Sequence, residues 1–335
     1  MSHKHVQQKR RHPLRVVLIL AVLLTVLAVG YRCLFQKPQL SPAESGAVSA
    51  AQSVQASSAA TSGAASQQAQ EADERKPDFY TILISGEDDG NGGSDTNILV
   101  AFDDGGKSVH CVSIPRDSGM YVRGKAAKIN SAYNRGGMDL LAASVSDGLG
   151  IPVDFTVKVN LKGFVKLVDA IGGVDFDIPI SMNYDDPKQD LSIHFKKGMQ
   201  HLNGQEALEV VRFRHNNDGS GYGSEDLGRI QTQQAFLKAV ARQTLTLSNV
   251  DQISTFARLF QKYVTTDLTL GNLAWLGKEA ISIGTDQIGF STLPGQWSGS
   301  RSLYLLDRDA VLTLVNTSLN PYTLDRTADD LNLPS

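Results

Sequence analysis

Three arginines in the middle of the chain have the residue type and spacing to bind a phosphorylated ligand. Arg212 and Arg214 are two residues apart, so in an extended segment they leave the same face while Phe213 turns away. Two guanidinium forks on one face can hold the oxygens of a pyrophosphate bidentately. Arg229 falls in the first turn of a predicted helix, where backbone N–H groups also favour an anion. Arg-x-Arg pairs are also common on solvated surfaces and in local ion pairs.

Carboxylates and a fourth arginine lie near the ends of predicted strands upstream of these residues. Asp88 follows one strand, Asp95 opens the next, and Arg116 ends a third within the sequence SIPRD. Two hard carboxylates are the usual protein share of a Mg²⁺ site that phosphates complete. Loops at strand ends are where α/β sheets bind ligands. The alternatives are ordinary turn chemistry for the aspartates and a local Arg116–Asp117 ion pair.

A possible nucleotide-binding loop can be rejected. Gly106-Lys107-Ser108 resembles the end of a phosphate-binding loop, but the first glycine of that motif would fall on Ala101. The segment 103–108 also joins two predicted strands and opens no helix. We therefore predict a hairpin turn there.

The elements that must position these side chains alternate between strand and helix patterns. Short β-branched runs between Gly- and Asp-rich turns predict strands, and amphipathic stretches that stop at glycines predict helices. This order predicts an α/β fold, an α-β-α sandwich whose central mixed sheet is flanked by helices. The stretch 179–202 is predicted to be irregular. The predicted strands are 80–84, 97–102, 109–114, 155–159, 174–178 and 287–292, and the predicted helices are 138–149, 161–171, 203–211, 226–247, 251–262, 272–283 and 307–319.

The N-terminal region predicts a membrane anchor. A basic stretch precedes an apolar run that is long enough to cross a bilayer if Arg32 reaches the interface. Positive charge before the run places the N-terminus in the cytoplasm and the rest outside a single-pass cell-membrane anchor. An Ala/Ser/Gln-rich stretch then predicts a flexible linker. The predicted segments are a cytoplasmic basic tail (1–15), a transmembrane anchor (16–35), a linker (36–76), an extracytoplasmic catalytic domain (77–322) and a C-terminal tail (323–335).

Other features limit the alternatives. A cleaved signal peptide competes with the retained anchor, because Ala28-Val29-Gly30 resembles a cleavage site. A net charge of −3 argues against a nucleic-acid binder, which would carry a basic domain. Cys33 lies at membrane level and Cys111 inside a predicted strand, so we expect neither a disulfide between them nor a metal site.

A series of motifs in unbroken order resembles the LytR-CpsA-Psr family across nearly all of the predicted domain. The resemblance begins in the strand-end segments that contain the candidate aspartates and Arg116. It continues through the Arg-x-Arg pair and the helix that follows it. The matching motifs are Gly86-Glu87-Asp88, Gly93-Ser94-Asp95-Thr96, Ser113 to Asp117, Lys128-Ile129-Asn130-Ser131-Ala132-Tyr133, Gly163-Phe164, Val168 to Val174, Leu202 to Leu208 leading to Arg212 and Arg214, Asp226 to Gln234, and Leu319 to Tyr322.

This resemblance implies a transferase. Such proteins hold a polyprenyl-pyrophosphate-linked glycopolymer in an apolar pocket with an arginine-lined mouth, and move its glycosyl phosphate onto peptidoglycan. Asp88 and Asp95 match the family's aspartates associated with Mg²⁺, with Mn²⁺ as an alternative. Together with Arg116 they are the predicted catalytic residues. The residues that match pyrophosphate-binding positions are Arg116, Arg212, Arg214 and Arg229, with Lys128 as a further candidate cation.

Two residues differ from the family's motifs, and three classes of function remain compatible with the sequence. Gly93 and Thr232 stand where the family often has arginine, so the expected pyrophosphate site has less positive charge, which Lys128 could offset. The helices 161–171 and 226–247 have enough large apolar residues to wall a lipid pocket or to form an ordinary core. Besides the transferase, a pyrophosphate hydrolase and a non-catalytic lipid-binding or regulatory protein fit the residues. The polymer, a teichoic acid, a capsule or another, and the oligomeric state are not specified.

Overall fold

The computed structural model describes residues 35–40, 73–87, 93–188, 191–223, 225–245 and 253–334. Nearly all of the predicted membrane anchor, most of the predicted linker and Asp88 lie outside these residues. Within the described part of the chain, no helix combines the length and apolar character needed to cross a bilayer.

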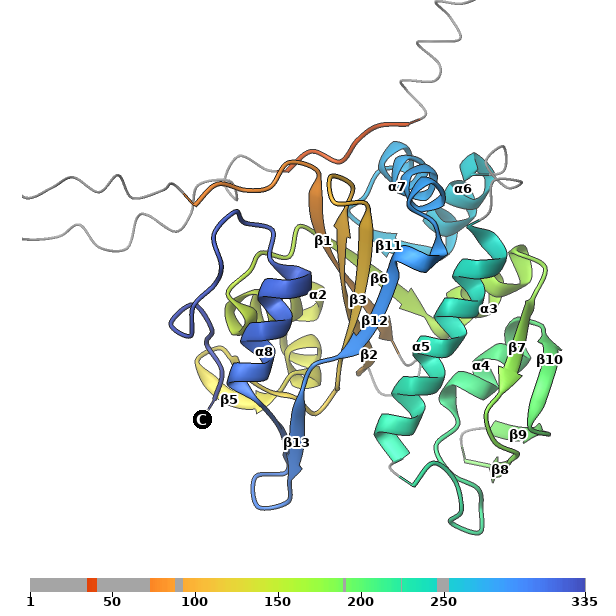
Figure 1. Ribbon diagram of the computed structural model, residues 1–335. Coiled ribbons are helices and arrows are strands. Elements are labelled where there is room, and N and C mark those ends of the chain that lie inside the picture. The colour runs from red at the N-terminus through yellow and green to blue at the C-terminus, as the bar shows by residue number, and fades with distance from the viewer. Residues whose placement is uncertain are drawn as a thin grey trace, which may run out of the picture.

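A six-stranded mixed sheet lies at the centre of the fold (Figure 1). Its strand order is β11-β6-β1-β2-β3-β12. The strands β1, β2 and β3 form an antiparallel meander, while β6 joins β1 and β12 joins β3 in parallel. The predicted hairpin between β2 and β3 is confirmed, and the Asp103 carboxylate accepts a 2.7 Å hydrogen bond from the backbone N–H of Gly106 in its turn. The strands are β1 (Phe79–Glu87), β2 (Ser94–Asp103), β3 (Ser108–Ile114), β6 (Phe155–Asn160), β11 (Val264–Thr266) and β12 (Ile288–Thr292).

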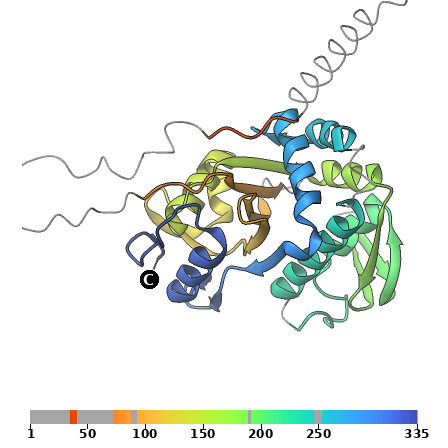
Figure 2. The same ribbon diagram turned by 45° about the horizontal axis from the view of Figure 1, so that its top comes forward.

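Helices cover both faces of this sheet, as the sequence predicted (Figures 1 and 2). Because side chains alternate between the faces of a strand, Leu83 and Leu99 point to one core while Ile82 and Val100 point to the other. The first core is closed by helices α2 and α8, and the second by α7 with parts of α5 and α6. The helices are α2 (Asn130–Leu149), α5 (Glu225–Thr244), α6 (Ile253–Tyr263), α7 (Leu270–Ile283) and α8 (Arg308–Leu314).

A smaller lobe packs beside the sheet, and here the prediction of an irregular stretch is wrong. Residues 179–202 contain three whole strands: the hairpin of β8 and β9, and β10, which pairs antiparallel with β7. Their inward-facing residues, such as Ile193 and Leu202, share a third core with Phe213 and Phe236. The sequence of β8, MNYDD, is too polar to reveal a strand. The elements are α3 (Leu161–Ala170), β7 (Val174–Ile178), β8 (Met182–Asp186), β9 (Leu191–Phe195), β10 (Gly198–Leu202) and α4 (Gly204–Arg212).

Other predicted boundaries also change. Helix α2 begins at Asn130, eight residues before the predicted start, and bends at Gly136 and Gly137, where the backbone leaves the helical conformation. The last predicted helix divides into α8 and the π-helical turn η3 (Val315–Leu319). Two hairpins were not predicted. They are β4 (Gly119–Val122) with β5 (Lys125–Lys128), and β13 (Gly295–Ser298) with β14 (Leu303–Leu306).

The folded unit extends beyond the predicted limits of 77 and 322. Near the predicted anchor, the backbone N–H of Gln36 donates to the Gly271 carbonyl at 3.1 Å, so residues 35–40 lie along α7 (Figure 2). Arg75 forms a buried ion pair with Asp154. At the C-terminal end, Leu331 and Leu333 are only 4% exposed and pack in the first core. Both ends of the predicted linker, and the predicted tail, therefore contact the fold.

Candidate active site

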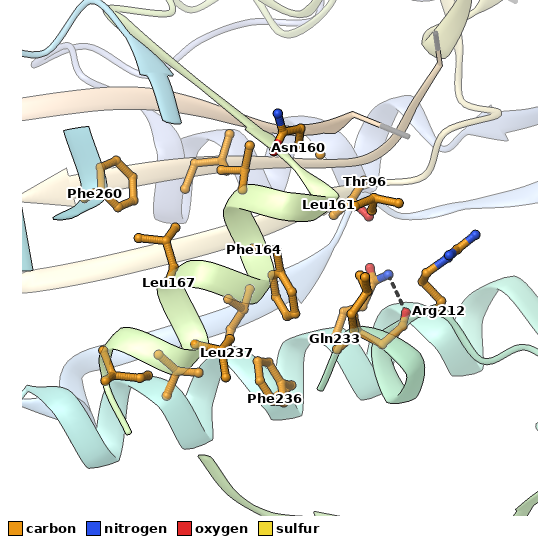
Figure 3. A pocket seen from close by; sticks show the side chains of 18 of the residues that line it. Thr96, Asn160, Leu161, Phe164, Leu167, Arg212, Gln233, Phe236, Leu237 and Phe260 are labelled. Atoms are coloured by element: carbon orange, nitrogen blue, oxygen red, sulfur yellow. Dashed lines mark hydrogen bonds between the residues drawn. The ribbon is translucent and has the colours of Figure 1, made fainter. Parts of the chain in front are cut away.

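A cavity of about 830 Å³ lies between the sheet and the smaller lobe. One wall is a single face of α5, where Arg229, Gln233, Phe236, Leu237 and Val240 recur at intervals of three and four residues. Of this stripe, Gln233 lies beside Arg212, while Phe236 and Leu237 lie farther along the cavity (Figure 3). The volume is at the upper end of the range of about 300–1,000 Å³ for small-molecule sites.

Helix α3 provides the facing wall. Its Phe164 side chain points toward Phe236 of α5, with ring centroids 5.8 Å apart, and Leu167 projects on the side of Phe260 (Figure 3). The helix begins beside the sheet because the Asn160 side chain accepts a 2.7 Å hydrogen bond from the backbone N–H of Gly163. Residues of α6 and α7 close the inner end, and Phe260 lies far from Arg212 in Figure 3. Both helices predicted to wall a lipid pocket therefore do line a cavity.

The mouth of the cavity brings together most of the predicted site residues. Asp95, Arg116, Arg212, Arg214 and Arg229 all line it, although they come from four separate segments of the chain. The Arg116 guanidinium donates a 2.6 Å hydrogen bond from Nη1 to Oδ1 of Asp95. The second oxygen of the same carboxylate lies 3.9 Å from Nη2 of Arg214. Asp95 thus links two of the arginines.

Local structure explains how Asp95 reaches this mouth. Its neighbour Ser94 is fully buried, with its hydroxyl oxygen 2.7 Å from that of Ser85 on β1. Ser94 also hydrogen-bonds the Asn97 side chain. Because successive residues of a strand alternate in direction, anchoring Ser94 inward turns the Asp95 side chain outward to the cavity.

The Arg-x-Arg pair follows helix α4 closely. A reciprocal capping box between Asn203 and Glu206 fixes the start of this helix, and Arg212 is its last residue. Phe213 is 1% exposed and packs edge-on against Tyr222, with ring centroids 5.5 Å apart. The buried ring holds the segment in place while both arginines line the cavity mouth, although Arg212 ends a helix and does not belong to an extended segment as predicted.

Arg229 is the most buried of the mouth arginines, with 5% of its surface exposed. Helix α5 starts at Glu225, so Arg229 begins the second turn rather than lying in the first as predicted. Burial of a guanidinium is costly unless anionic or hydrogen-bonding groups accompany it. A small adjoining pocket is lined by Arg229 together with Asp95 and Arg116, which places these three side chains around one point.

Lys128 is held away from the cavity. Its ammonium group lies 2.9 Å from Oδ1 of Asp117, and 5.5 Å from the centre of the Trp297 ring. Asp117 also lies 3.9 Å from Nε of Arg116. Lys128 is therefore connected to the mouth through Asp117, and it is absent from the residues that line the cavity.

The profile of the LytR_cpsA_psr family matches residues 46–319, more than three quarters of the chain. This chain belongs to that family. The polyisoprenyl-teichoic acid–peptidoglycan teichoic acid transferase TagU of Bacillus cereus is 38% identical over 199 residues, which are 58% of this chain and 62% of TagU. TagV of Bacillus subtilis, of the same named activity, is 32% identical over 271 residues, which are 76% of this chain and 66% of TagV.

Solved structures of family members have the same fold. The crystal structure of Bacillus subtilis TagV superposes with a TM-score of 0.62 at 29% identity, covering 73% of this chain and 96% of that one. A structure of TagT bound to LIIa-WTA superposes with a TM-score of 0.58 at 25% identity, covering 74% and 92%. The chain matches just under two thirds of the full length of the curated relatives, 62% and 66%.

The structure gives different explanations for the two departures from the family pattern. The Thr232 hydroxyl donates to the Tyr222 hydroxyl at 2.8 Å, and the side chain is 4% exposed and does not line the cavity. Thr232 therefore packs against Tyr222, the ring that supports Phe213. At Gly93, an added Cβ would meet no atom within 4 Å, so the backbone there leaves room for a side chain.

Sequence reasoning missed a polar cluster at the edge of the mouth. Glu87 lines the cavity, and its carboxylate lies 3.3 Å from the ammonium of Lys158 on β6. Burial, followed by a hydrogen bond with Glu87, raises the pKa of Tyr133. Burial opposes the charged form of Lys158, but its bonds with Glu87 and Tyr133 raise its pKa overall. Glu87 and Tyr133 lie within family motifs, which was the available signal.

One of the two carboxylates predicted to bind Mg²⁺, that of Asp95, lies within the described residues. Nowhere in the described ranges do three His, Cys, Asp or Glu side chains gather as ligands. A Mg²⁺ ion that binds phosphates needs only one or two carboxylates from the protein. The Asp95 carboxylate at the mouth fits that requirement, while Asp88 lies outside the described residues.

Proposed function

We propose that this protein transfers a glycopolymer phosphate, such as that of a teichoic acid, from a polyprenyl-pyrophosphate carrier to peptidoglycan. The observation that carries the proposal is the joining of an apolar cavity of about 830 Å³ to a mouth lined by four arginines. A lipid chain suits the apolar walls of α3, α5 and α6, and a pyrophosphate suits the arginines. The names of the relatives TagU and TagV support the same activity.

In the proposed reaction, an acceptor hydroxyl attacks the phosphorus atom next to the saccharide. A new P–O bond to the acceptor forms, the P–O bond to the lipid-side phosphate breaks, and polyprenyl phosphate leaves with the bonding electrons. The proton of the acceptor hydroxyl is released to water. Phosphoryl transfer of this kind depends mainly on positioning and on stabilising charge.

The residues at the mouth have distinct parts in this proposal. Arg212 and Arg214, held by the buried Phe213, bind the pyrophosphate from the side of α4. Arg116 binds it from the end of β3, and its 2.6 Å bond to Asp95 fixes the direction of the guanidinium. Arg229, 5% exposed, presents its charge from α5 in surroundings where charge interactions are strong.

We further propose that Asp95, with Asp88, holds a Mg²⁺ ion, or Mn²⁺ in its place. Such an ion would supply additional positive charge to the phosphates. Asp95 also has a role that does not require the ion, because it bonds Arg116 and lies near Arg214. Lys128 supports the site indirectly by neutralising Asp117, which lies beside Arg116.

For the whole chain, we propose a single-pass membrane protein. A basic cytoplasmic tail (1–15) precedes the anchor (16–35), and the catalytic domain lies outside the cell. The membrane-bound position agrees with a lipid-linked substrate, since carrier and enzyme then share one surface. The attachment of residues 35–40 to α7 would keep the anchor close to the apolar end of the cavity, which α6 and α7 line.

The test uses the fragment from residue 35 onward, incubated with a polyprenyl-pyrophosphate saccharide, Mg²⁺ and peptidoglycan oligomers. Mass spectrometry should find a saccharide–phosphate–acceptor adduct, and the variants Asp95→Ala and Arg212→Ala should form far less of it. Sugar phosphate released to water, with no adduct, would indicate a hydrolase. Lipid binding without any product would indicate a binding protein and refute the transferase.

A further inference from the structure

An exposed tryptophan lies near the candidate active site. Trp297, on strand β13, has 56% of its surface exposed. Tryptophan is usually well buried, so exposing the ring forgoes a large hydrophobic gain and often indicates a binding surface. The other tryptophan, Trp275, packs against Tyr80 and Phe102 in the core. The exposure of Trp297 therefore requires an explanation that packing does not provide.

The ring is held on a braced hairpin. Trp297 pairs with Tyr304 across β13 and β14, and the backbone N–H of Tyr304 donates to the Asp117 carbonyl at 2.9 Å. Gly295 lets the strands approach, since a Cβ there would lie 2.3 Å from the Leu305 carbonyl oxygen. The hairpin that carries Trp297 is thus joined directly to the segment that carries Arg116 and Asp117.

A continuous series of contacts leads from the cavity mouth to the ring. Asp95 contacts Arg116 at 2.6 Å, and Arg116 lies 3.9 Å from Asp117. Asp117 in turn lies 2.9 Å from Lys128, whose ammonium is 5.5 Å from the centre of the Trp297 ring. The ring is therefore connected to Arg116 through Asp117 and Lys128, and it is solvent-exposed and outside the cavity lining.

The chemistry of the hairpin suits a sugar. An indole ring offers a flat face for the C–H groups of a pyranose, and the nearby hydroxyls of Ser298 and Ser300, 3.2 Å apart, can hydrogen-bond its hydroxyls. Exposed tryptophan is also typical of membrane interfaces. Figure 1 argues against that use, because β13 lies at the opposite end of the molecule from residues 35–40, which follow the predicted anchor.

We propose that Trp297 is a stacking platform for a sugar ring of the acceptor, a peptidoglycan glycan strand. This inference rests on the proposed transferase function and assigns the acceptor to the Asp117 side of the mouth. The donor lipid and its phosphates occupy the cavity and the arginines around it, which leaves the face beside Arg116 and Lys128 for the strand whose hydroxyl attacks. Trp297 acts as a positioning residue, since it lies outside the cavity lining.

The experiment compares Michaelis constants for the two substrates in the full chain, held in detergent micelles. Trp297→Ala should raise the KM for peptidoglycan glycan oligomers about tenfold, the loss expected of one aromatic stacking contact. The donor KM should stay within about twofold of the unaltered value. Trp297→Phe, which keeps a flat ring, should restore most of the acceptor affinity. Met199→Ala, at a remote side chain that is 70% exposed, is the matched control and should change neither constant.

A second measurement separates this inference from the transferase itself. In a Trp275→Phe background, Trp297 is the only tryptophan, and glycan oligomers added without donor should change its fluorescence. Turnover with an unchanged acceptor KM in Trp297→Ala would overturn the platform and leave the transferase standing. A rise in donor KM instead would overturn it as well. A saturable fluorescence change without any turnover would support the platform and refute the transferase.

Discussion

Asp95 and Arg116 form an ion pair at the cavity mouth, with 2.6 Å between Oδ1 and Nη1. The other carboxylate oxygen lies 3.9 Å from Nη2 of Arg214, so one acidic residue on β2 orders arginines from two distant segments. This arrangement gives Asp95 an electrostatic task that does not depend on a metal ion. It also means that neutralising Asp95 should disturb the geometry of the arginine cluster.

We therefore expect Asp95→Asn, which keeps the size of the side chain, to lower kcat about 10²-fold, comparable to losing one preorganised charge-stabilising group. Its melting temperature should change little, because both partners are partly exposed. Asp139→Asn, an exposed change on α2, serves as the control and should leave kcat unaltered. Retention of more than half the activity in Asp95→Asn would contradict this role.

The cavity itself can be tested by filling it. Val240 faces the cavity from α5, so Val240→Trp should obstruct a long chain and weaken the binding of a long polyprenyl phosphate at least about tenfold. A short-chain analogue, which needs less of the cavity, should bind almost as before. Lys238→Trp adds the same ring on the exposed side of the helix and should affect neither ligand. Equal affinities for Val240→Trp and the control would place the lipid elsewhere.

The sequence was sufficient to predict five of the six strands of the central sheet, though not β11, together with the helices on both of its faces. Strands such as β1 and β3 were recognised as short runs rich in β-branched residues, because both of their faces pack against a core. The arginines and Asp95 were found through motif order. Their meeting at one mouth is a consequence of tertiary structure, since spacing along the chain does not determine contact between β2, β3, α4 and α5.

Other features left little trace in the sequence. Strands β8 and β13 are short and largely polar, so their alternation is too weak to recognise. Lys128 was predicted at the pyrophosphate, yet its position beside Asp117 and Trp297 depends on two hairpins that were not predicted. The hydrogen bond between Thr232 and Tyr222 was not predicted either, because the motif does not determine the direction of the Thr232 side chain on α5.

Gln234 joins α5 to the sheet. Its side-chain amide Nε2 has two N–H donors and lies within hydrogen-bond distance of three oxygens: the Ser113 hydroxyl at 2.9 Å, the Ser291 carbonyl at 2.8 Å and the Thr292 hydroxyl at 3.0 Å. Gln234→Ala leaves these acceptors unsatisfied, and we expect it to lower the free energy of unfolding by about 1–3 kcal/mol. Urea denaturation measures this loss. Gln205→Ala, exposed on α4, is the control and should cost less than about 0.5 kcal/mol.

The ion pair between Arg75 and Asp154 fastens the start of the domain. Both side chains are almost inaccessible, 7% and 0% exposed, and Asp154 also accepts a 2.8 Å bond from the backbone N–H of Thr81. Arg75→Met leaves a buried, uncompensated carboxylate and should destabilise the fold by about 3–5 kcal/mol.

A fragment that starts at Lys76 removes the same guanidinium and should be destabilised similarly. One that starts at residue 72 keeps it and provides the matched comparison. Equal unfolding midpoints for the two fragments in urea would show that the pair contributes nothing.

Cys111 provides a prediction for alkaline pH. Burial raises the pKa of its thiol from 9.0 to about 12, because the interior disfavours the thiolate. The folded state therefore keeps the proton at pH values where the unfolded chain has lost it. The stabilisation is complete below pH 9 and declines as the pH rises toward 12.

Two proteins are compared: Cys33→Ser, which keeps Cys111, and Cys33→Ser with Cys111→Ala. Between pH 9 and 11 the melting temperature should fall more steeply in the first, because only that protein has the buried thiol. Reaction with a disulfide reagent at pH 8 should also be slow until denaturant is added, since the thiolate is the reactive form. Parallel pH profiles for the two proteins, or rapid labelling of the folded state, would show that this thiol is not shielded as the fold implies.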